Sequence, residues 1–470
     1  MPESVTLSYP VWLAYGVGHV LNDLCSSIWF TYTLLFFEIV LEFDSSLAGA
    51  AIVIGQIVDG LSTPIVGILS DKRFDHWIFK YGRRKIWHLL GTILVSISFP
   101  FIFSPYYGFP HLNPVQQLLY YSAFIICFQM GWAATQVSHL SLVPDLTSDQ
   151  HSRTSLYTIR YSFTVLSNII VYIIFLAVLH FNNAKSDNIL GPKDERKFQL
   201  LAFIVVVIGA IMSTIFHIGV KEKHDQSNDG DRLIASTPDR LSRLSLFRNP
   251  KMYAVGCIYV ATRLFVNLSQ VYIPYYIHTY LRLMSKKLAI LPLVMYISSF
   301  ITSTVVHQLN VHFGRKVTYL VGALIGLLSC LWVHVGRNED IFFKTYEVYG
   351  VVIFFGCACA IILVTSLGIS ADLIGQDTDN GAFVYGILSF GDKISNGLAV
   401  FLIQNLKANH YNNYYKNALT IGCAVSLILG SAAILLLKLP EPTDVSSDVI
   451  TDSENKIDES EVNTTVNRQQ

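Results

Sequence analysis

The sequence is short of charge. Only 14% of its 470 residues are charged and 52% are hydrophobic, whereas soluble proteins carry about 25% charged residues. Lys and Arg together number 33, as do Asp and Glu, so the chain lacks the basic excess of nucleic-acid-binding proteins. Its seven Cys are an odd number and contain no CxxC motif, which excludes a disulfide scaffold and a zinc cage. A mean hydropathy of +0.46 indicates a bilayer as the solvent.

Long apolar runs are what the sequence has in place of charge. A helix needs about 20 mainly apolar residues to cross the hydrocarbon, and twelve stretches qualify: 10–41, 46–70, 86–104, 116–143, 157–181, 198–220, 252–280, 288–310, 315–336, 343–370, 382–406 and 415–439. We therefore predict an all-α membrane protein with twelve transmembrane helices in two six-helix halves. Pro64 and Pro274 are expected to kink their helices. With no basic n-region or cleavage site before it, the first stretch is expected to remain as a span.

The distribution of basic residues predicts the orientation. The loops after 10–41 and 86–104 contain no Lys or Arg. The loop after 46–70 contains six: Lys72, Arg73, Lys80, Arg83, Arg84 and Lys85. By the positive-inside rule this loop is cytoplasmic, and so are both termini. The expected organisation is an N-terminal half over 1–220, a cytoplasmic linker over 221–250 and a C-terminal half over 251–439. The polar, acidic residues 440–470 are expected to be a disordered tail.

A short basic motif occurs twice, at equivalent places in the two halves. Residues 81–85 read Tyr-Gly-Arg-Arg-Lys and residues 313–316 read Phe-Gly-Arg-Lys. Each follows the second stretch of its half. Two six-helix halves joined by a polar loop are the plan of many secondary transporters, so the repeat favours a transporter.

We single out six of the ionisable residues inside the predicted spans: Asp23, Asp59, Asp392, Arg160, Arg263 and Lys393. Each costs about 2.5–3.5 kcal/mol at the bilayer centre on insertion scales. Left unpaired, the six would together exceed a typical folding stability of about 5–15 kcal/mol. They must pair or face a water-filled cavity, and we predict that Asp59 lies within pairing reach of Lys393 or Arg160.

Polar residues continue these positions as stripes at helical spacing on five stretches. The stripes are Tyr15, His19, Asn22 and Asp23 on 10–41; Gln56, Asp59 and Thr63 on 46–70; Gln129, Trp132, Gln136 and His139 on 116–143; Tyr259, Arg263, Asn267 and Gln270 on 252–280; and Tyr385, Ser389, Asp392, Lys393 and Asn396 on 382–406. A shared aqueous cavity between the halves would explain these stripes. The alternative is interhelical hydrogen bonding, worth about 0.6 kcal/mol a bond. His19 is more typical of a packed or hydrogen-bonded histidine than of a metal ligand. The residues expected to contact substrate are Tyr15, His19, Asn22, Asp23, Asp59, Arg160, Tyr259, Arg263, Asn267, Gln270, Tyr385 and Lys393. We expect Arg263 to hold a substrate carboxylate unless it pairs with a helix-end acid such as Asp372, and Asp23 or Asp59 to hold the amine.

The loop between the second and third stretches resembles a signature of the major facilitator superfamily. Gly67-x-x-x-Asp71-Lys72-Arg73 is followed by Gly82-Arg83-Arg84-Lys85. The resemblance implies that the loop gates the cytoplasmic side through Gly67, Asp71, Arg83 and Arg84.

The run Asp59 to Gly67 and Ser141-Leu-Val-Pro144 resemble motifs of the glycoside-pentoside-hexuronide:cation symporters. In that family further acids hold the sugar and the coupling cation, but here Thr63 and Gln136 stand at those positions. Sodium prefers several hard oxygen ligands, so we expect no sodium coupling, and either proton coupling through Asp23 or Asp59 or none.

Longer runs over nearly all twelve stretches resemble a narrower family of major facilitator proteins of lysosomal and melanosomal membranes. They include residues 18–25, 98–105, 138–142, 262–270 and 371–386. The resemblance implies import of cysteine into the organelle and an effect on pigment. Asp229, followed four residues later by Leu233-Ile234, fits an acidic dileucine signal that sorting adaptors read on the cytoplasmic side.

Three functions stay open: a carrier of cysteine or a similar small amino acid, a sugar:cation symporter, and a receptor or scaffold that transports nothing. Paired charges suit a zwitterion, and the aromatic rings on the stripes suit a sugar. The sequence shows no nucleophile–His–acid set, phosphate loop or metal-ligand spacing, so we expect no enzyme activity, cofactor or metal. The expected partners are a small-molecule substrate, the bilayer and sorting adaptors, with no nucleic acid.

Overall fold

The structure, a computed structural model, describes residues 8–71, 77–106, 113–147, 149–181, 189–222, 250–337, 339–374, 378–407 and 413–437. Within these ranges the regular structure is helical throughout. Eleven helices are long and apolar enough to cross a membrane, because the predicted stretches 288–310 and 315–336 are merged into one 49-residue element. All twelve predicted spans are therefore recovered as helix.

In its described residues, the N-terminal half is built from eight α-helices and three short 3₁₀ or π turns. They are α1 (Tyr9–Val17), α2 (Val20–Leu35), η1 (Phe36–Val40), α3 (Ser45–Asp71), η2 (Trp77–Tyr81), α4 (Arg83–Ile102), α5 (Pro114–Ser141), α6 (Val143–Leu146), α7 (Gln150–Phe181), η3 (Pro192–Asp194) and α8 (Glu195–Gly219). The first predicted span is thus three consecutive pieces, with a turn at Gly18 and His19 between α1 and α2.

The part of the C-terminal half that the structure describes has five long α-helices and two π turns. They are α11 (Pro250–Tyr275), η4 (Tyr276–Tyr280), α12 (Lys287–Val335), η5 (Phe343–Glu347), α13 (Val348–Ile374), α14 (Thr378–Asn405) and α15 (Tyr414–Leu436). Both prolines expected to mark kinks lie inside helices, Pro64 in α3 and Pro274 near the end of α11. Directly after Pro274, α11 passes into the wider π turn η4.

A single glycine divides α12 into two spans. Gly314 has φ 76° and ψ 155°, a backbone conformation that is essentially restricted to glycine. The hydroxyl of Thr318 donates to the carbonyl of Leu309, nine residues earlier, over 3.1 Å. Nine residues of straight helix would span about 13.5 Å, so the chain folds back at Gly314.

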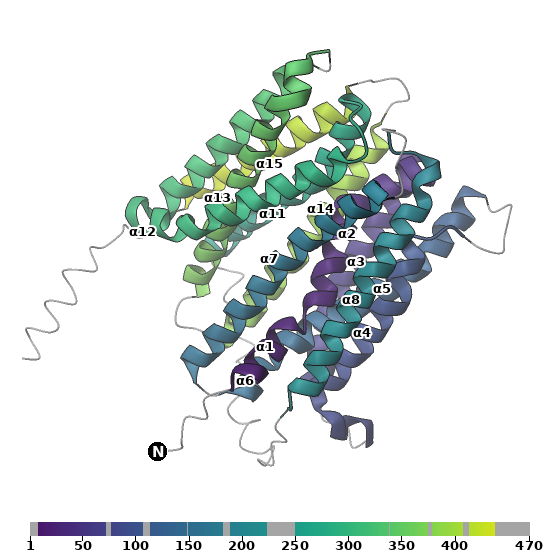
Figure 1. The fold of residues 1–470 in the computed structure, drawn as a ribbon. Helices are drawn as coiled ribbons and strands as arrows, with labels where there is room; N and C mark the ends of the chain where they lie inside the picture. The colour runs from purple at the N-terminus through teal and green to yellow at the C-terminus, as the bar shows by residue number, and fades with distance from the viewer. Residues whose placement is uncertain are drawn as a thin grey trace, which may run out of the picture.

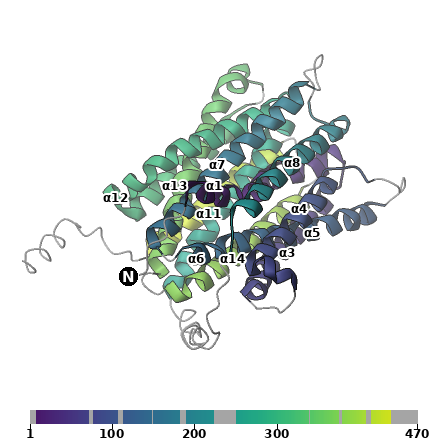
Figure 2. The same ribbon diagram turned by 60° about the horizontal axis from the view of Figure 1, so that its bottom comes forward.

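The two halves lie side by side and meet along three helix pairs: α3 with α14, α7 with α12 and α2 with α11 (Figure 1). Figure 2 views the same bundle with its lower end brought forward. The core between the helices is rich in fully buried aromatic rings such as Tyr32, Phe99 and Tyr272. Apolar side chains also cover the outside, with Ile218 75% and Leu436 82% exposed, as a lipid-facing surface requires.

The first helix of each half ends in the same way. The π turns η1 and η4 are both five residues long and begin 240 residues apart, at Phe36 and Tyr276 (276 − 36). A residue with positive φ follows each at the same offset: Glu42 at 56° and Arg282 at 51°. The two halves are thus related in backbone detail, which the basic motif repeat alone did not indicate.

Candidate functional site

An ion pair joins the two halves in the middle of the bundle. Nζ of Lys393 on α14 lies 2.8 Å from Oδ1 of Asp59 on α3, and it also donates to the hydroxyl of Thr63 over 3.0 Å. All three side chains come from the stripes predicted on 46–70 and 382–406. The predicted pairing of Asp59 with Lys393 is confirmed, while the pairing with Arg160 is not seen.

Arg263 on α11 pairs with a second carboxylate of α14. Its Nε donates to Oδ2 of Asp392 over 2.8 Å, and Asp392 also accepts from the amide of Asn396. The helix-end acid Asp372 is not the partner; it pairs instead with Arg315 inside the C-terminal half. The Arg263–Asp392 bond does not use the two terminal guanidinium nitrogens.

We call Asp23, Asp59, Asp392, Arg160, Arg263 and Lys393 together the charged layer. Its third acid, Asp23, is bound within the N-terminal half. Its Oδ1 lies 2.9 Å from Nδ1 of His19, and its Oδ2 accepts from the hydroxyl of Thr164 over 2.9 Å. Arg160, one turn before Thr164 on α7, has its Nε buried with no hydrogen-bond partner among the described residues. The layer therefore contains three paired acids and one guanidinium with an unused donor.

The other predicted substrate residues divide between the interface and the packing of each half. Tyr15 is fully buried, with its ring stacked on His139 and its hydroxyl donating to the His139 carbonyl. Asn22 donates to the carbonyl of Trp132. Gln270 donates to the hydroxyl of Tyr296 over 2.6 Å. Tyr15 thus serves the packing of its own half rather than the interface.

A small cavity lies between the halves beside this layer. Its volume is about 20 Å³, room for about one water molecule. Its polar lining comes from both halves, Gln56 from α3, Asn267 from α11 and Asn396 from α14, and Trp29 forms one wall. Tyr259 packs next to a separate apolar cluster of Met252, Val384 and Leu388. The side chain of Tyr385 lies outside the described residues.

The predicted gating loop is anchored inside the N-terminal half. Arg84, in the first turn of α4, lies 3.4 Å from a carboxylate oxygen of Asp145. The carboxylate of Glu222 accepts from the backbone N–H groups of Arg84 and Lys85, where the helix dipole favours an anion. Gly67 lies near Val137 of α5. The role of Arg83 remains a prediction, and the side chain of Asp71 and the sorting residues Asp229, Leu233 and Ile234 lie outside the described residues.

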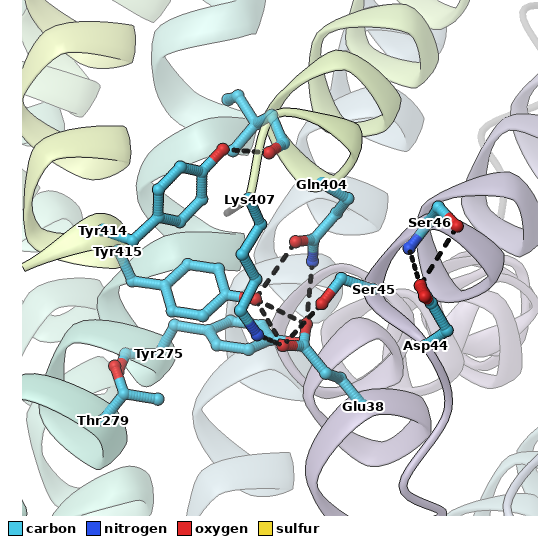
Figure 3. Close-up of polar contacts among 11 residues, drawn as sticks. Glu38, Asp44, Ser45, Ser46, Tyr275, Thr279, Gln404, Lys407, Tyr414 and Tyr415 are labelled. Atoms are coloured by element: carbon cyan, nitrogen blue, oxygen red, sulfur yellow. Dashed lines mark hydrogen bonds and ion pairs between the residues drawn. The ribbon is translucent and has the colours of Figure 1, made fainter. Parts of the chain in front are cut away.

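The sequence analysis missed a further polar cluster, formed around Glu38 in η1 (Figure 3). The Glu38 carboxylate is buried and accepts hydrogen bonds or pairs with five side chains: Tyr415 (2.5 and 2.6 Å), Tyr275 (3.0 Å), Ser45 (3.1 Å), Gln404 (3.1 Å) and Lys407. Four of the five belong to the C-terminal half. Glu38 lies close to the end of its span, where charged residues are common, so its charge alone did not indicate a site. The signal that could have indicated it is its position, which is equivalent to that of the ionisable residue His278 in η4.

Comparisons with known proteins agree with this geometry. A family model described as MFS/sugar transport protein matches residues 14–438. Major facilitator superfamily domain-containing protein 12 of Mus musculus is 44% identical over 85% of this chain and 86% of its own, and that of Homo sapiens is 43% identical over 86% of each. Among solved structures, a D-xylose-proton symporter superposes with a TM-score of 0.70 at 13% identity, covering 93% of this chain and 98% of its own.

The fold, the paired charges between two halves and these matches define a membrane transporter of the major facilitator superfamily. The chain belongs to the MFS/sugar transport protein family. Within that family it is similar over most of its length to major facilitator superfamily domain-containing protein 12, as the residue runs in the sequence predicted.

Proposed function

We propose that the chain is a secondary carrier that moves cysteine, or a similar small amino acid, across a lysosomal or melanosomal membrane by alternating access. The observation that carries the proposal is the charged layer between the halves. A zwitterion needs a cation for its carboxylate and an acid for its amine. The layer offers both, because Arg160 has an unused Nε and lies one turn before Thr164, whose hydroxyl donates to Asp23.

Arg263 is the proposed carboxylate ligand, with Arg160 as the second cation of the site. The bond from Arg263 to Asp392 fixes the guanidinium and leaves its terminal nitrogens for a fork onto a carboxylate. Asp23 or Asp59 would hold the amine. Each carboxylate exchanges its internal partner, His19 or Lys393, for the ammonium group of the substrate.

The position of Lys393 supports transport without sodium. Its ammonium lies 2.8 Å from Oδ1 of Asp59 and 3.0 Å from Oγ1 of Thr63, so it occupies the oxygens that a bound cation would need. A tethered ammonium replaces a diffusible ion there. Proton coupling through Asp23 or Asp59 is the form of coupling that this arrangement leaves open.

A sugar is the second candidate substrate. A lactose permease of Leuconostoc lactis is 22% identical over 75% of this chain, and the family model itself is described as including sugar transport. In the predicted stripes Trp132 donates to Gln136 over 2.9 Å, so its ring is held in place as a stacking surface. Aromatic faces of this kind suit a sugar ring.

Uptake by the purified full-length chain in lipid vesicles tests the proposal. Labelled cysteine should enter, and unlabelled cysteine should compete better than cystine, sugars or lysolipids. For variants that remove a positive charge from the charged layer, Arg337→Gln at an exposed arginine is the matched control. Competition by a sugar alone would favour the second candidate, and the absence of any uptake with properly folded protein would favour a receptor or scaffold.

The proposed location and orientation have their own test. The dileucine signal at Leu233 and Ile234 favours the lysosome and melanosome, and the basic residues of the loop after α3 favour cytoplasmic termini. An epitope tag at either terminus should be reached by antibody on intact isolated organelles, without permeabilisation of the organelle membrane. A tag that is reached only after that membrane is permeabilised would place the terminus in the lumen.

A further inference from the structure

Glu38 and His278 are equivalent residues of the two halves. Each is the third residue of its π turn, Phe36–Val40 or Tyr276–Tyr280. Each also reaches across to the other half. Glu38 contacts Tyr275, Gln404, Lys407 and Tyr415 of the C-terminal half, and Nε2 of His278 lies 2.8 Å from the carbonyl of Leu190 in the N-terminal half.

These contacts close one end of the bundle. Glu38 and Ser45 flank the start of α3, whereas the basic motif of residues 81–85 follows the opposite end of that 27-residue helix. The Glu38 end is therefore the end away from the basic loop. The rings of Tyr275 and Tyr415, whose hydroxyls both donate to the Glu38 carboxylate, lie with centroids 4.3 Å apart and planes tilted by 32°. Opening this end for alternating access requires Glu38 to release all four partners in the C-terminal half.

The Glu38 site is also open to water from one side. A hollow of about 550 Å³ lies over it, and its lining is shared between the halves: Glu38, Glu42, Asp44, Ser45, Ser46, Gln404, Asn405 and Lys407 are among the residues that form it. A proton from this side can therefore reach the carboxylate without crossing the bundle.

We propose that Glu38 is a proton-binding site of the transporter and that its protonation releases the contact between the halves at this end. The proton adds to one carboxylate oxygen. It removes the negative charge that pairs with Lys407, and it turns one acceptor oxygen into a donor. A neutral Glu38 cannot accept from Tyr415 through both oxygens while also accepting from Tyr275, Gln404 and Ser45.

The direction of the effect follows from where the hydrogen bonds are made. The four partners from the C-terminal half hold the ionised carboxylate only while this end is closed. The proton therefore binds more tightly to the open state, and a ligand shifts an equilibrium toward the state that it binds better. Acid on the Glu38 side should open that side. The inference rests on the chain being an alternating-access carrier but not on the identity of its substrate.

Other titratable and charged groups surround Glu38 and must be separated from it. Three of these groups touch Glu38 directly: Lys407, Tyr275 and Tyr415. The others lie on the neighbouring elements: Tyr272, Tyr414, His278, Glu42, Asp44, Asp194 and Lys197. Asp194 and Lys197 already pair with each other over 2.6 Å. Histidine is the side chain whose ordinary charge change falls between pH 5 and 8, so His278 needs its own control.

A distance measurement across the Glu38 end tests the proposal without any substrate. Spin labels at Ser46→Cys and Asn405→Cys, one in each half, would be placed in the full chain after Cys127 and Cys257, the two exposed thiols, are replaced by Ser. In lipid nanodiscs we expect the fraction of separated halves to rise several-fold between pH 7.5 and pH 5. Glu38→Gln should be open to a similar extent at both pH values.

Matched variants identify the responsible group. Glu42→Gln removes an exposed carboxylate four residues away, and His278→Gln keeps a donor for Leu190; both should retain the pH response. Lys407→Ala keeps the Glu38 carboxylate but removes its ion pair, so it should be more open at pH 7.5 and still respond to acid. A pH response that survives in Glu38→Gln, or that is absent from the parent chain, overturns the proposal. Failure of cysteine uptake would leave this measurement unaffected.

Discussion

Lys393 and Asp59 form an ion pair between the two halves of the bundle, 2.8 Å apart and almost fully buried. Buried pairs of this kind depend on both members, because the removal of one leaves the other charge in a medium of low polarity. The pair therefore couples the packing of α3 against α14 to the charge state of the site.

Loss of one member of this pair should lower the stability of the folded protein more than loss of both members. We expect Lys393→Met to destabilise the protein by about 3–5 kcal/mol, as for other broken buried pairs. The double variant Asp59→Asn/Lys393→Met should recover much of that loss. Thermal unfolding of the four proteins in detergent measures the coupling, and additive effects of the two substitutions would contradict it.

Sodium should have no effect on transport. Lys393 occupies the oxygens of Asp59 and Thr63 that a cation would need. Replacement of sodium by choline at fixed pH should leave the initial rate of uptake into vesicles unchanged. A collapse of uptake in choline would show that a sodium site exists elsewhere in the chain.

Arg263 should affect substrate affinity more than protein abundance. One charge-assisted hydrogen bond is worth about 1.5–3 kcal/mol, so Arg263→Ala should raise the half-saturation concentration for cysteine by at least about tenfold. Arg263→Lys should rescue poorly, because an ammonium group cannot make the fork. Uptake is to be measured per correctly located molecule. Unchanged affinity at reduced abundance would assign Arg263 only to the pair with Asp392.

The dileucine signal should determine the destination of the chain. Substitution of Leu233 and Ile234 by Ala is expected to move the protein to the plasma membrane, because adaptors would no longer bind it. Fluorescence microscopy with a lysosomal marker gives the result, with a substitution of the neighbouring Ser236 as the control. Continued lysosomal residence would place the signal in another segment.

The backbone at Arg282 should tolerate glycine better than a branched residue. A φ of 51° costs an L-residue about 1–2 kcal/mol, and a β-branched side chain adds to this. Arg282→Val should lower the midpoint of thermal unfolding and Arg282→Gly should not. The pair Glu42→Val and Glu42→Gly is expected to behave in the same way, since Glu42 holds the equivalent position.

The helices could be predicted from the sequence because their apolar stretches are long and clearly bounded. The span predicted at 157–181 matches the apolar part of α7, Ser155–His180, but the helix itself begins earlier, at Gln150. Hydropathy detects only the part of a helix inside the bilayer, whereas Asp149 caps an extension outside it by accepting from the backbone N–H of Ser152. An Asp at position 149, just before Gln150, is a helix-capping residue that could have been recognised in the sequence as the start of this helix.

The charged layer could be predicted only in part. Helical spacing shows that Asp59 and Lys393 share faces with other polar groups, but it does not show which helices are neighbours. The partner of Asp59 was therefore left as Lys393 or Arg160, and the actual partner of Arg263, Asp392, was not identified. Glu38 escaped notice because its partners lie up to 377 residues away in the sequence.

The turn at Gly314 has a consequence for how the C-terminal half enters the membrane. The two spans of α12 are joined by a single residue, and Arg315 directly after it is tied to Asp372 and to the carbonyl of Gly368 on α13. With so short a connection, neither span has the slack to cross the bilayer while the other waits outside. The two spans should leave the insertion machinery together as one helical hairpin. A side chain at position 314 should therefore impair membrane insertion during biosynthesis, before any transport is possible.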